Sequence, residues 1–392
     1  MKTALQAEHL SVATHRHQGG HRNRRPWLRR GLLGMMLVFI LAAPALGGTP
    51  NSDTPRALSP LVGDTDSFGR GINNRGQVAG YSQGAVTTAV RWDRDGNATP
   101  LLPLGTDLHS FGEAVNNRGQ VVGRSRSGQS LCATAVDTAV VWDKHGVATA
   151  LSPLPGHVEA RGYGINNRGI AVGISLGPRA DPAGGNCTVT FTAVTWDRDG
   201  NPTELTSPSS VLVESFANDI SNNGAVAGFI YVDSPTAFEF AGATWDRHGV
   251  PTMLPGPAGS IISAAERLNN RGVIVGYDID ISTFATSALL WDKGGNLSTL
   301  PPLGTDAEAV AADINGRGSV VGSSGAGLAG VVLFFPGATG RAVIWDKHGV
   351  PTALPPLSAA AADCFGLGIN DPGHVVGYCV DSGGANTAVI WR

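Results

Sequence analysis

The chain of 392 residues contains 54 Gly and 24 Pro, but charged residues make up only 15% of it, a composition typical of many short strands joined by tight turns. Its formal charge at pH 7 is −3, and removal of residues 1–45, which contain seven Lys and Arg and one acid, leaves 21 basic and 30 acidic residues. This excess of acid excludes nucleic acid as a partner, because phosphates require clustered cations.

Residues 1–45 differ in composition from the rest of the chain. A basic stretch is followed by the apolar run of residues 31–43 and by Ala43-Pro44-Ala45, the order typical of an export signal cleaved after Ala45. The segment Arg24 to Arg29 resembles a twin-arginine export motif. We therefore expect a secreted protein, exported across the bacterial cytoplasmic membrane, with residues 46–55 as a linker. The alternative is an uncleaved anchor, although the run is short for a membrane span of ~20 residues.

One sequence unit recurs seven times from residue 56 to the end. Its first signature is a turn related to Asn-Asn-Arg-Gly, within residues 71–80, 114–123, 164–173, 219–228, 267–276, 313–322 and 368–377. Its second signature is a tryptophan, at Trp92, Trp142, Trp196, Trp245, Trp291, Trp345 and Trp391. The mean spacing of about 50 residues falls in the range of repeats that form propellers.

Each unit contains four short β-rich segments. The first ends at the residues preceding the Asn-Asn turn, the second runs through Val-Val-Gly, the third ends at the tryptophan, and the fourth follows an Asp-Lys-His-Gly turn. Gly at the end of that turn, as at Gly96 and Gly146, suits a backbone conformation with positive φ. Four antiparallel strands make one blade, and seven blades predict an all-β, seven-bladed β-propeller over residues 56–392.

The two ends of the chain are expected to close the ring. The last unit stops at Arg392, one strand short, whereas residues 56–61 match the fourth strand of the other units, such as residues 99–104. We expect this N-terminal strand to pair beside residues 389–391 and to remove an open sheet edge.

The Asn-Asn-x-Gly-x-Val-Val-Gly block and the tryptophan strand resemble the bacterial extracellular repeats of the HAF family, over residues 56–392. The His-Ala-Phe for which the family is named is replaced by Thr-Ala-Val, as at Thr138 to Val140, so the chain resembles a divergent member. The resemblance implies an extracellular repeat protein and carries no established activity.

Four cysteines follow the export signal. Cys364 and Cys379 flank one turn almost symmetrically and are expected to face each other across a hairpin, whereas Cys132 and Cys187 lie in equivalent loops of neighbouring units. An even number in an oxidising compartment favours two disulfides with these pairings, and free buried thiols are the alternative. No pair has Cys-x-x-Cys spacing, so we predict no metal site, and no cofactor motif is present.

A candidate ligand site comes from aligning the seven units. The position six residues before the last residue of each first strand is acidic in five units and is occupied by Asp66, His109, Glu159, Glu214, Ile262, Glu308 and Asp363. We expect these residues in linkers just before the first strands, at the mouth of the central channel. There they would concentrate negative potential and attract a cation or a basic partner. The alternative is that they are solvated linker residues.

No local catalytic motif is found in the sequence. We therefore predict a monomeric, non-catalytic binding or adhesion module that takes an unknown protein, glycan or cationic ligand. Because the segments between the second and third strands vary in length, as in residues 83–87, 176–191 and 325–340, we expect the ligand on their side of the ring. A polysaccharide-active enzyme, or another hydrolase or lyase on the same scaffold, is the alternative.

Overall fold

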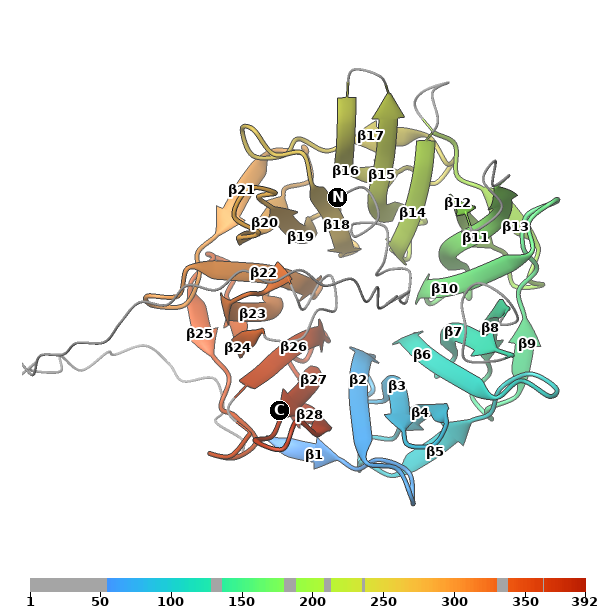
Figure 1. Ribbon diagram of the computed structural model, residues 1–392, viewed down its shortest axis with the longest axis horizontal. Coiled ribbons are helices and arrows are strands. Elements are labelled where there is room, and N and C mark those ends of the chain that lie inside the picture. The colour runs from blue at the N-terminus through green and yellow to red at the C-terminus, as the bar shows by residue number, and fades with distance from the viewer. Residues whose placement is uncertain are drawn as a thin grey trace, which may run out of the picture.

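The computed structural model describes residues 55–127, 136–179, 188–207, 213–234, 237–329, 338–361 and 363–392. These residues form seven four-stranded antiparallel sheets arranged in a ring, which confirms the seven-bladed β-propeller (Figure 1). The predicted export signal and nearly all of the predicted linker lie outside the described residues. Within the ranges given above, no helix has the length and apolar character needed to cross a membrane.

The strands of each blade follow one another in sequence, from the channel outward. Blade 1 contains β2 (Asp66–Ile72), β3 (Val78–Gln83), β4 (Thr87–Trp92) and β5 (Ala98–Leu101). Blade 2 contains β6 (His109–Val115), β7 (Val121–Arg126), β8 (Asp137–Trp142) and β9 (Ala148–Ala150). Blade 3 contains β10 (Glu159–Ile165), β11 (Ala171–Arg179), β12 (Thr188–Trp196) and β13 (Pro202–Glu204). Blade 4 contains β14 (Val213–Ile220), β15 (Val226–Ser234), β16 (Ala237–Trp245) and β17 (Pro251–Met253).

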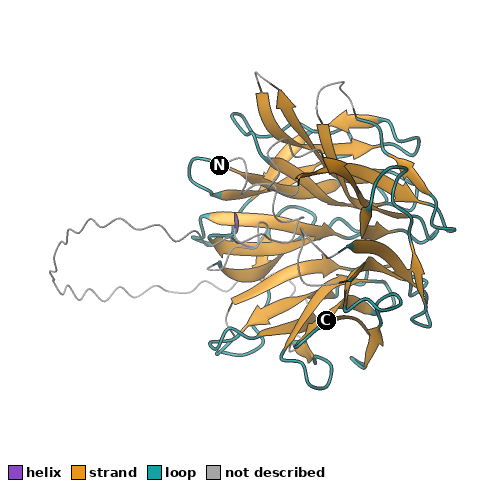
Figure 2. Cartoon of the chain, turned by 45° about the vertical axis from the view of Figure 1, so that its right-hand side comes forward, coloured by secondary structure: helices purple, strands orange, loops and turns teal. Residues whose placement is uncertain are grey.

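The remaining blades repeat this order. Blade 5 contains β18 (Ser263–Leu268), β19 (Ile274–Ile279), β20 (Thr286–Trp291) and β21 (Leu297–Leu300). Blade 6 contains β22 (Glu308–Ile314), β23 (Val320–Ala326), β24 (Thr339–Trp345) and β25 (Pro351–Ala353). Blade 7 contains β26 (Asp363–Ile369), β27 (Val375–Val380), β28 (Asn386–Trp391) and the N-terminal β1 (Arg56–Leu58). Strands form the body of each blade, and loops join their ends (Figure 2).

Strand β1 closes the ring as the sequence predicts. It pairs antiparallel with β28, with Arg56 opposite Ile390 and Leu58 opposite Ala388 (Figure 1). The Leu58 side chain is buried, and its carbonyl oxygen accepts a hydrogen bond of 2.9 Å from the Ser67 hydroxyl in blade 1. The first and last parts of the propeller are therefore joined both within a sheet and between sheets.

The seven tryptophans connect each blade to the one before it. All are buried, and each indole Nε1 donates a hydrogen bond of 2.6–3.0 Å to a carbonyl oxygen in the segment that leaves the preceding blade. The acceptors are Ser59, Leu102, Ser152, Thr206, Pro255, Pro301 and Pro355. Since a buried indole N–H needs a partner, this bond fixes how far one blade is offset from the next.

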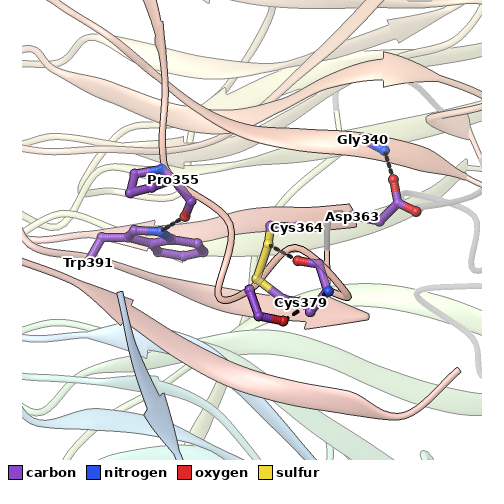
Figure 3. The surroundings of a disulfide bond; sticks show 8 residues. Gly340, Pro355, Asp363, Cys364, Cys379 and Trp391 are labelled. Carbon is purple, nitrogen blue, oxygen red and sulfur yellow. Dashed lines mark hydrogen bonds between the residues drawn. A yellow bond between two sulfur atoms is a disulfide. The ribbon is translucent and has the colours of Figure 1, made fainter. Parts of the chain in front are cut away.

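The predicted pairing of Cys364 with Cys379 is confirmed. The two residues lie directly opposite each other on β26 and β27, and their sulfur atoms form a disulfide (Figure 3). Cys132 and Cys187, predicted to form the second disulfide, lie outside the described residues.

Replacing Cys364 and Cys379 together by serine should lower the stability of the propeller. Serine already occupies the equivalent positions in blade 1, at Ser67 and Ser82, so the double variant should fold. Loss of a crosslink that closes a 15-residue loop is expected to cost about 3 kcal/mol. Urea denaturation of the mature chain under oxidising conditions measures this cost. Equal stability of variant and wild type would mean that the disulfide does not restrict the unfolded chain.

Candidate functional site

The Asn-Asn-Arg-Gly turns gather around the channel axis at one face of the ring, called the Asn face below; the opposite face is called the loop face. Within a turn, the first Asn caps its own backbone, as Asn73 Oδ1 does by accepting hydrogen bonds of 3.0 Å from the N–H groups of Arg75 and Gln77. The turn ends at Gly76, whose φ of 77° is strained for other residues.

The amide nitrogen of the same Asn reaches the next blade. Asn73 Nδ2 donates a hydrogen bond of 2.8 Å to the carbonyl oxygen of Asn116. Equivalent bonds of 3.0–3.1 Å join Asn116 to Asn166, Asn166 to Ser221, Asn269 to Asn315, Asn315 to Asn370, and Asn370 back to Asn73. These residues are buried, so the bonds form an inner belt that is interrupted only where Ser221 replaces Asn.

The second residue of six turns, all but the one with Gly316, forms a further belt, in which its side chain accepts a hydrogen bond from the preceding blade. Asn117 Oδ1 accepts a hydrogen bond of 2.8 Å from the backbone N–H of Asn74 in the preceding blade. The same contact, at 2.7–2.9 Å, is accepted by Asn167, Asn222, Asn270, Asp371 and Asn74. The second residue is Asn in five of the seven turns, although a hairpin needs only the first. This repetition is the signal in the sequence that indicates contacts beyond the turn.

The two belts surround a polar pocket on the axis of the propeller, with a volume of about 160 Å³. Every blade contributes three consecutive residues to its wall: one from the end of its innermost strand and two from its turn. Blade 3, for example, contributes Ile165, Asn166 and Asn167. Because seven turns of one length meet here, the pocket is a direct product of the sequence repeat.

Side-chain donors remain available at the rim of this pocket. For Asn117, Asn167, Asn222 and Asn270 the Oδ1 atom accepts a backbone N–H, so the Nδ2 group must lie on the other side of the planar amide. Among the described residues, these four Nδ2 groups have no hydrogen-bond acceptor. They are therefore free to bind a ligand in the pocket.

The six polar residues predicted at the channel mouth are not in linkers. Five of them begin an inner strand and Glu214 is the second residue of one: Asp66 in β2, His109 in β6, Glu159 in β10, Glu214 in β14, Glu308 in β22 and Asp363 in β26. The expectation that they precede the strands is wrong, because their backbones already pair with the second strand, as Asp66 does with Gln83.

Most of these side chains accept hydrogen bonds from the preceding blade. Asp66 Oδ1 accepts hydrogen bonds from the backbone N–H and the amide Nδ2 of Asn386, and Asp363 Oδ1 accepts one of 3.0 Å from Gly340 N–H (Figure 3). His109, Glu159 and Glu308 likewise accept from Thr87, Asp137 and Thr286. Glu214 is buried, with 5% of its surface exposed. At the loop face, these polar groups are therefore already used to join neighbouring blades.

Inside the channel, blades 1 and 2 contribute a charged network that the sequence repeat does not predict. Glu113 on β6 forms ion pairs with Arg70 on β2, at 3.1 Å, and with Arg124 on β7, at 2.9 Å. The Arg124 guanidinium also lies 4.1 Å from the centre of the Phe111 ring. Although burial raises the pKa of Glu113, the two guanidinium groups outweigh it and hold the pKa below its usual value.

A second network joins blades 2 and 3. Asp137 accepts two hydrogen bonds from Arg126, at 2.6 and 2.9 Å, and lies 2.7 Å from Arg161. Burial raises the pKa of Asp137, but Arg161 and the bonds from Arg126 lower it to about 2. Burial raises the pKa of the neighbouring Glu159. Asp137 is therefore ionised at neutral pH and is committed to binding arginine.

Two further acids, both half-buried, bridge blades close to the pocket. Asp219 Oδ2 accepts a hydrogen bond from the N–H of Leu268, and Asp313 Oδ2 accepts one of 2.8 Å from the N–H of Ile369. Burial raises the pKa of Asp313 to about 7, although Arg267 opposes the shift, and burial also raises the pKa of Asp219. Asp313 is therefore expected to titrate close to neutral pH.

In the part of the chain that the structure describes, no group of three or more His, Cys, Asp or Glu side chains is arranged to hold a metal ion. The variable segment of residues 325–340 contains an apolar run, of which residues 331–335 lie outside the described ranges, whereas Leu328 before them is buried.

Comparison with known proteins supports the fold. No protein-family model matches the chain, and no curated protein matches its sequence. The likeness to HAF repeats stays a prediction. Virginiamycin B lyase from Staphylococcus aureus is similar in structure, with a TM-score of 0.50 and 14% identity over 86% of this chain and 99% of that one.

Two peptidases are also similar in structure. An acylaminoacyl peptidase from Pyrococcus horikoshii has a TM-score of 0.52 and 10% identity, over 84% of this chain and 52% of its own. Prolyl oligopeptidase B from Galerina marginata has a TM-score of 0.52 and 11% identity, over 84% of this chain and 49% of its own. At such low identity the shared property is the propeller fold, which hosts several unrelated activities.

Proposed function

We propose that the protein is an exported, non-catalytic binding module whose ligand enters the axial pocket on the Asn face. The observation that carries the proposal is the convergence of turns from all seven blades on one polar pocket, with amide donors at its rim. Convergent polar groups held by a rigid scaffold are typical of ligand sites.

The chemistry of the pocket supports binding rather than catalysis. Its polar side chains are mostly amides, which donate and accept hydrogen bonds but do not transfer protons at neutral pH. Asp371 is the one carboxylate in its wall, and it accepts hydrogen bonds from the Gly316 N–H and from Asn74 Nδ2, both at 2.7 Å. The wall therefore offers recognition without an obvious general acid or base.

The proposal places the ligand opposite to the side expected from the variable segments. At the loop face, Asp66, Glu308 and Asp363 already accept hydrogen bonds from the preceding blade. A cation there would compete with these bonds, whereas a ligand on the Asn face would meet uncommitted donors. The Cys364–Cys379 disulfide supports export to an oxidising compartment, and ring closure within a single chain supports a monomer.

Replacing Asn117, Asn167 and Asn222 together by aspartate should remove ligand capture. Aspartate keeps the oxygen that accepts the backbone N–H, as Asp371 does in blade 7, but it replaces each Nδ2 donor by an acceptor. Capture would be measured on a glycan array with residues 46–392, and thermal melting would check the fold. We expect wild-type capture to be lost with a nearly unchanged melting temperature.

The matched control replaces Glu159 and Glu308 by glutamine and Asp363 by asparagine. This variant should melt earlier, because it weakens bonds between blades, but it should keep its ligand. Loss of capture in the control, with capture retained by the aspartate variant, would place the site at the loop face. Release of shortened glycan products by the wild type would favour an enzyme over a binding module.

A further inference from the structure

We infer that the group bound in the axial pocket is an oxyanion, and specifically a carboxylate of an acidic saccharide. This inference rests on the proposed function and adds the chemical class of the ligand. It depends on three features of the Asn face: the orientation of its amides, the cations around the pocket and the state of its single acid.

The amides at the rim present donors only. Asn117, Asn167 and Asn222 each commit Oδ1 to a backbone N–H of the preceding blade, at 2.7–2.8 Å. Reversing any of these amides would set Nδ2 against an N–H group, so the belt itself fixes their orientation. A ligand that meets several Nδ2 groups at once must supply several acceptor oxygens, as a carboxylate or a sulfate does.

Arginine follows the second Asn position in most turns. The third turn residue is Arg75, Arg118, Arg168, Arg271 or Arg317 in five blades, and all five are exposed. None of these five guanidinium groups forms an ion pair or a side-chain hydrogen bond with another described residue. Since guanidinium binds planar oxyanions with two parallel hydrogen bonds, an anionic ligand that extends beyond the pocket would meet suitable partners in the same turns.

Asp371, the only acid in the pocket wall, does not neutralise the nearby arginines. Asp371 binds Gly316 N–H through Oδ1 and Asn74 Nδ2 through Oδ2, so its oxygens already have donors. The five arginines do not line the pocket itself, but each follows a wall residue directly in the chain, and together they outnumber the one engaged carboxylate of the wall. An anionic ligand is therefore favoured over a cationic or neutral one.

The size and charge of the domain favour a saccharide over nucleic acid. The pocket, at about 160 Å³, has room for one ring-sized polar group, such as a single sugar residue. Residues 46–392 contain 30 acidic against 21 basic residues, which opposes a densely charged polyphosphate chain more than a saccharide with one charge per sugar. A chain of sugars with spaced carboxylates meets both conditions, with one carboxylate in the pocket and others near the arginines.

Isothermal titration of residues 46–392 with oligogalacturonate tests the inference. The methyl-esterified oligomer is the neutral control, and acetate tests a free small anion. We expect the acid oligomer to bind at least about tenfold more tightly than its ester, and its binding to weaken with salt. Acetate alone should bind far more weakly, because it lacks the neighbouring carboxylates that reach the arginines.

Two matched variants test which basic residues contribute to binding of the acid oligomer. Replacing Arg118, Arg168 and Arg271 by glutamine should weaken binding by about tenfold or more. Replacing Lys144, Lys293 and Lys347 by glutamine removes the same charge from the outer turns of the Asn face and should change binding by less than about twofold. Equal weakening by both sets would overturn a specific role for the arginines.

The remaining outcomes separate this inference from the proposed function. Equal affinity for acid and ester, lost in the Asn117, Asn167 and Asn222 aspartate variant, would keep the pocket as a site but overturn the oxyanion. Binding of the acid oligomer that survives this aspartate variant would overturn both. Tighter binding of single-stranded DNA than of oligogalacturonate would assign the arginines to nucleic acid and would also overturn the inference.

Discussion

Deleting residues 56–61 should unfold or severely destabilise the propeller. Strand β1 supplies the fourth strand of blade 7, and its Leu58 side chain is 1% exposed. Loss of one such leucine alone costs about 2–5 kcal/mol. The deletion also removes the acceptors of Ser67 and of the Trp92 indole, at the carbonyls of Leu58 and Ser59, so the total loss should exceed about 5 kcal/mol.

Thermal and urea denaturation measure this loss, and aggregation of the truncated chain would follow from an open sheet edge. Deletion of residues 46–54 is the matched control and should have little effect. The single change Leu58→Ala should lower stability, whereas Ala57→Ser, at an exposed position of the same strand, should not. A truncated chain as stable as the wild type would show that β1 does not close the ring.

The stability of the protein should also depend on Asp313 between acidic and neutral pH. Burial raises the pKa of this carboxyl from 3.8 to about 7, so the folded state holds the proton more tightly than the unfolded state does. Stability conferred by Asp313 is therefore present at low pH and falls as pH rises from about 4 to about 7, above which it levels off. The shift corresponds to a loss of about 4 kcal/mol.

Comparison with Asp313→Asn isolates this contribution. Urea denaturation across the pH range should show the wild type losing stability relative to the variant as pH rises. Asp346→Asn is a control of opposite sign, since hydrogen bonds from Val350 and His348 lower the pKa of Asp346 and its contribution is lost as pH falls. A difference between wild type and Asp313→Asn that does not change with pH would mean that folding does not raise the pKa of Asp313.

The features that the sequence predicts are those encoded within one repeat. Strand alternation, the turn glycines and the tryptophan spacing define a four-stranded blade, and the missing last strand indicates closure by residues 56–58. The pairing of Cys364 with Cys379 follows from their symmetric distance to one turn. In each case the relevant contacts lie within one sheet, whose register is determined by the turn.

The features that the sequence does not predict depend on contacts between blades. Nothing in one unit shows that the second Asn of a turn accepts a hydrogen bond from the previous turn, or that Asp66 reaches Asn386 across the chain ends. The Arg70–Glu113–Arg124 network joins three strands from two blades at positions where the repeat varies. Such contacts depend on the offset between neighbouring sheets, which a pattern of alternating residues does not specify.

The most direct test of the account is a crystal structure of residues 46–392 with the glycan that the array identifies. We expect ligand oxygens in the axial pocket, within hydrogen-bond distance of the Nδ2 atoms of Asn117, Asn167 and Asn222, with no reacted bond in the ligand. A ligand bound instead at the loop face, beside Glu159 and Asp363, would contradict the proposed site.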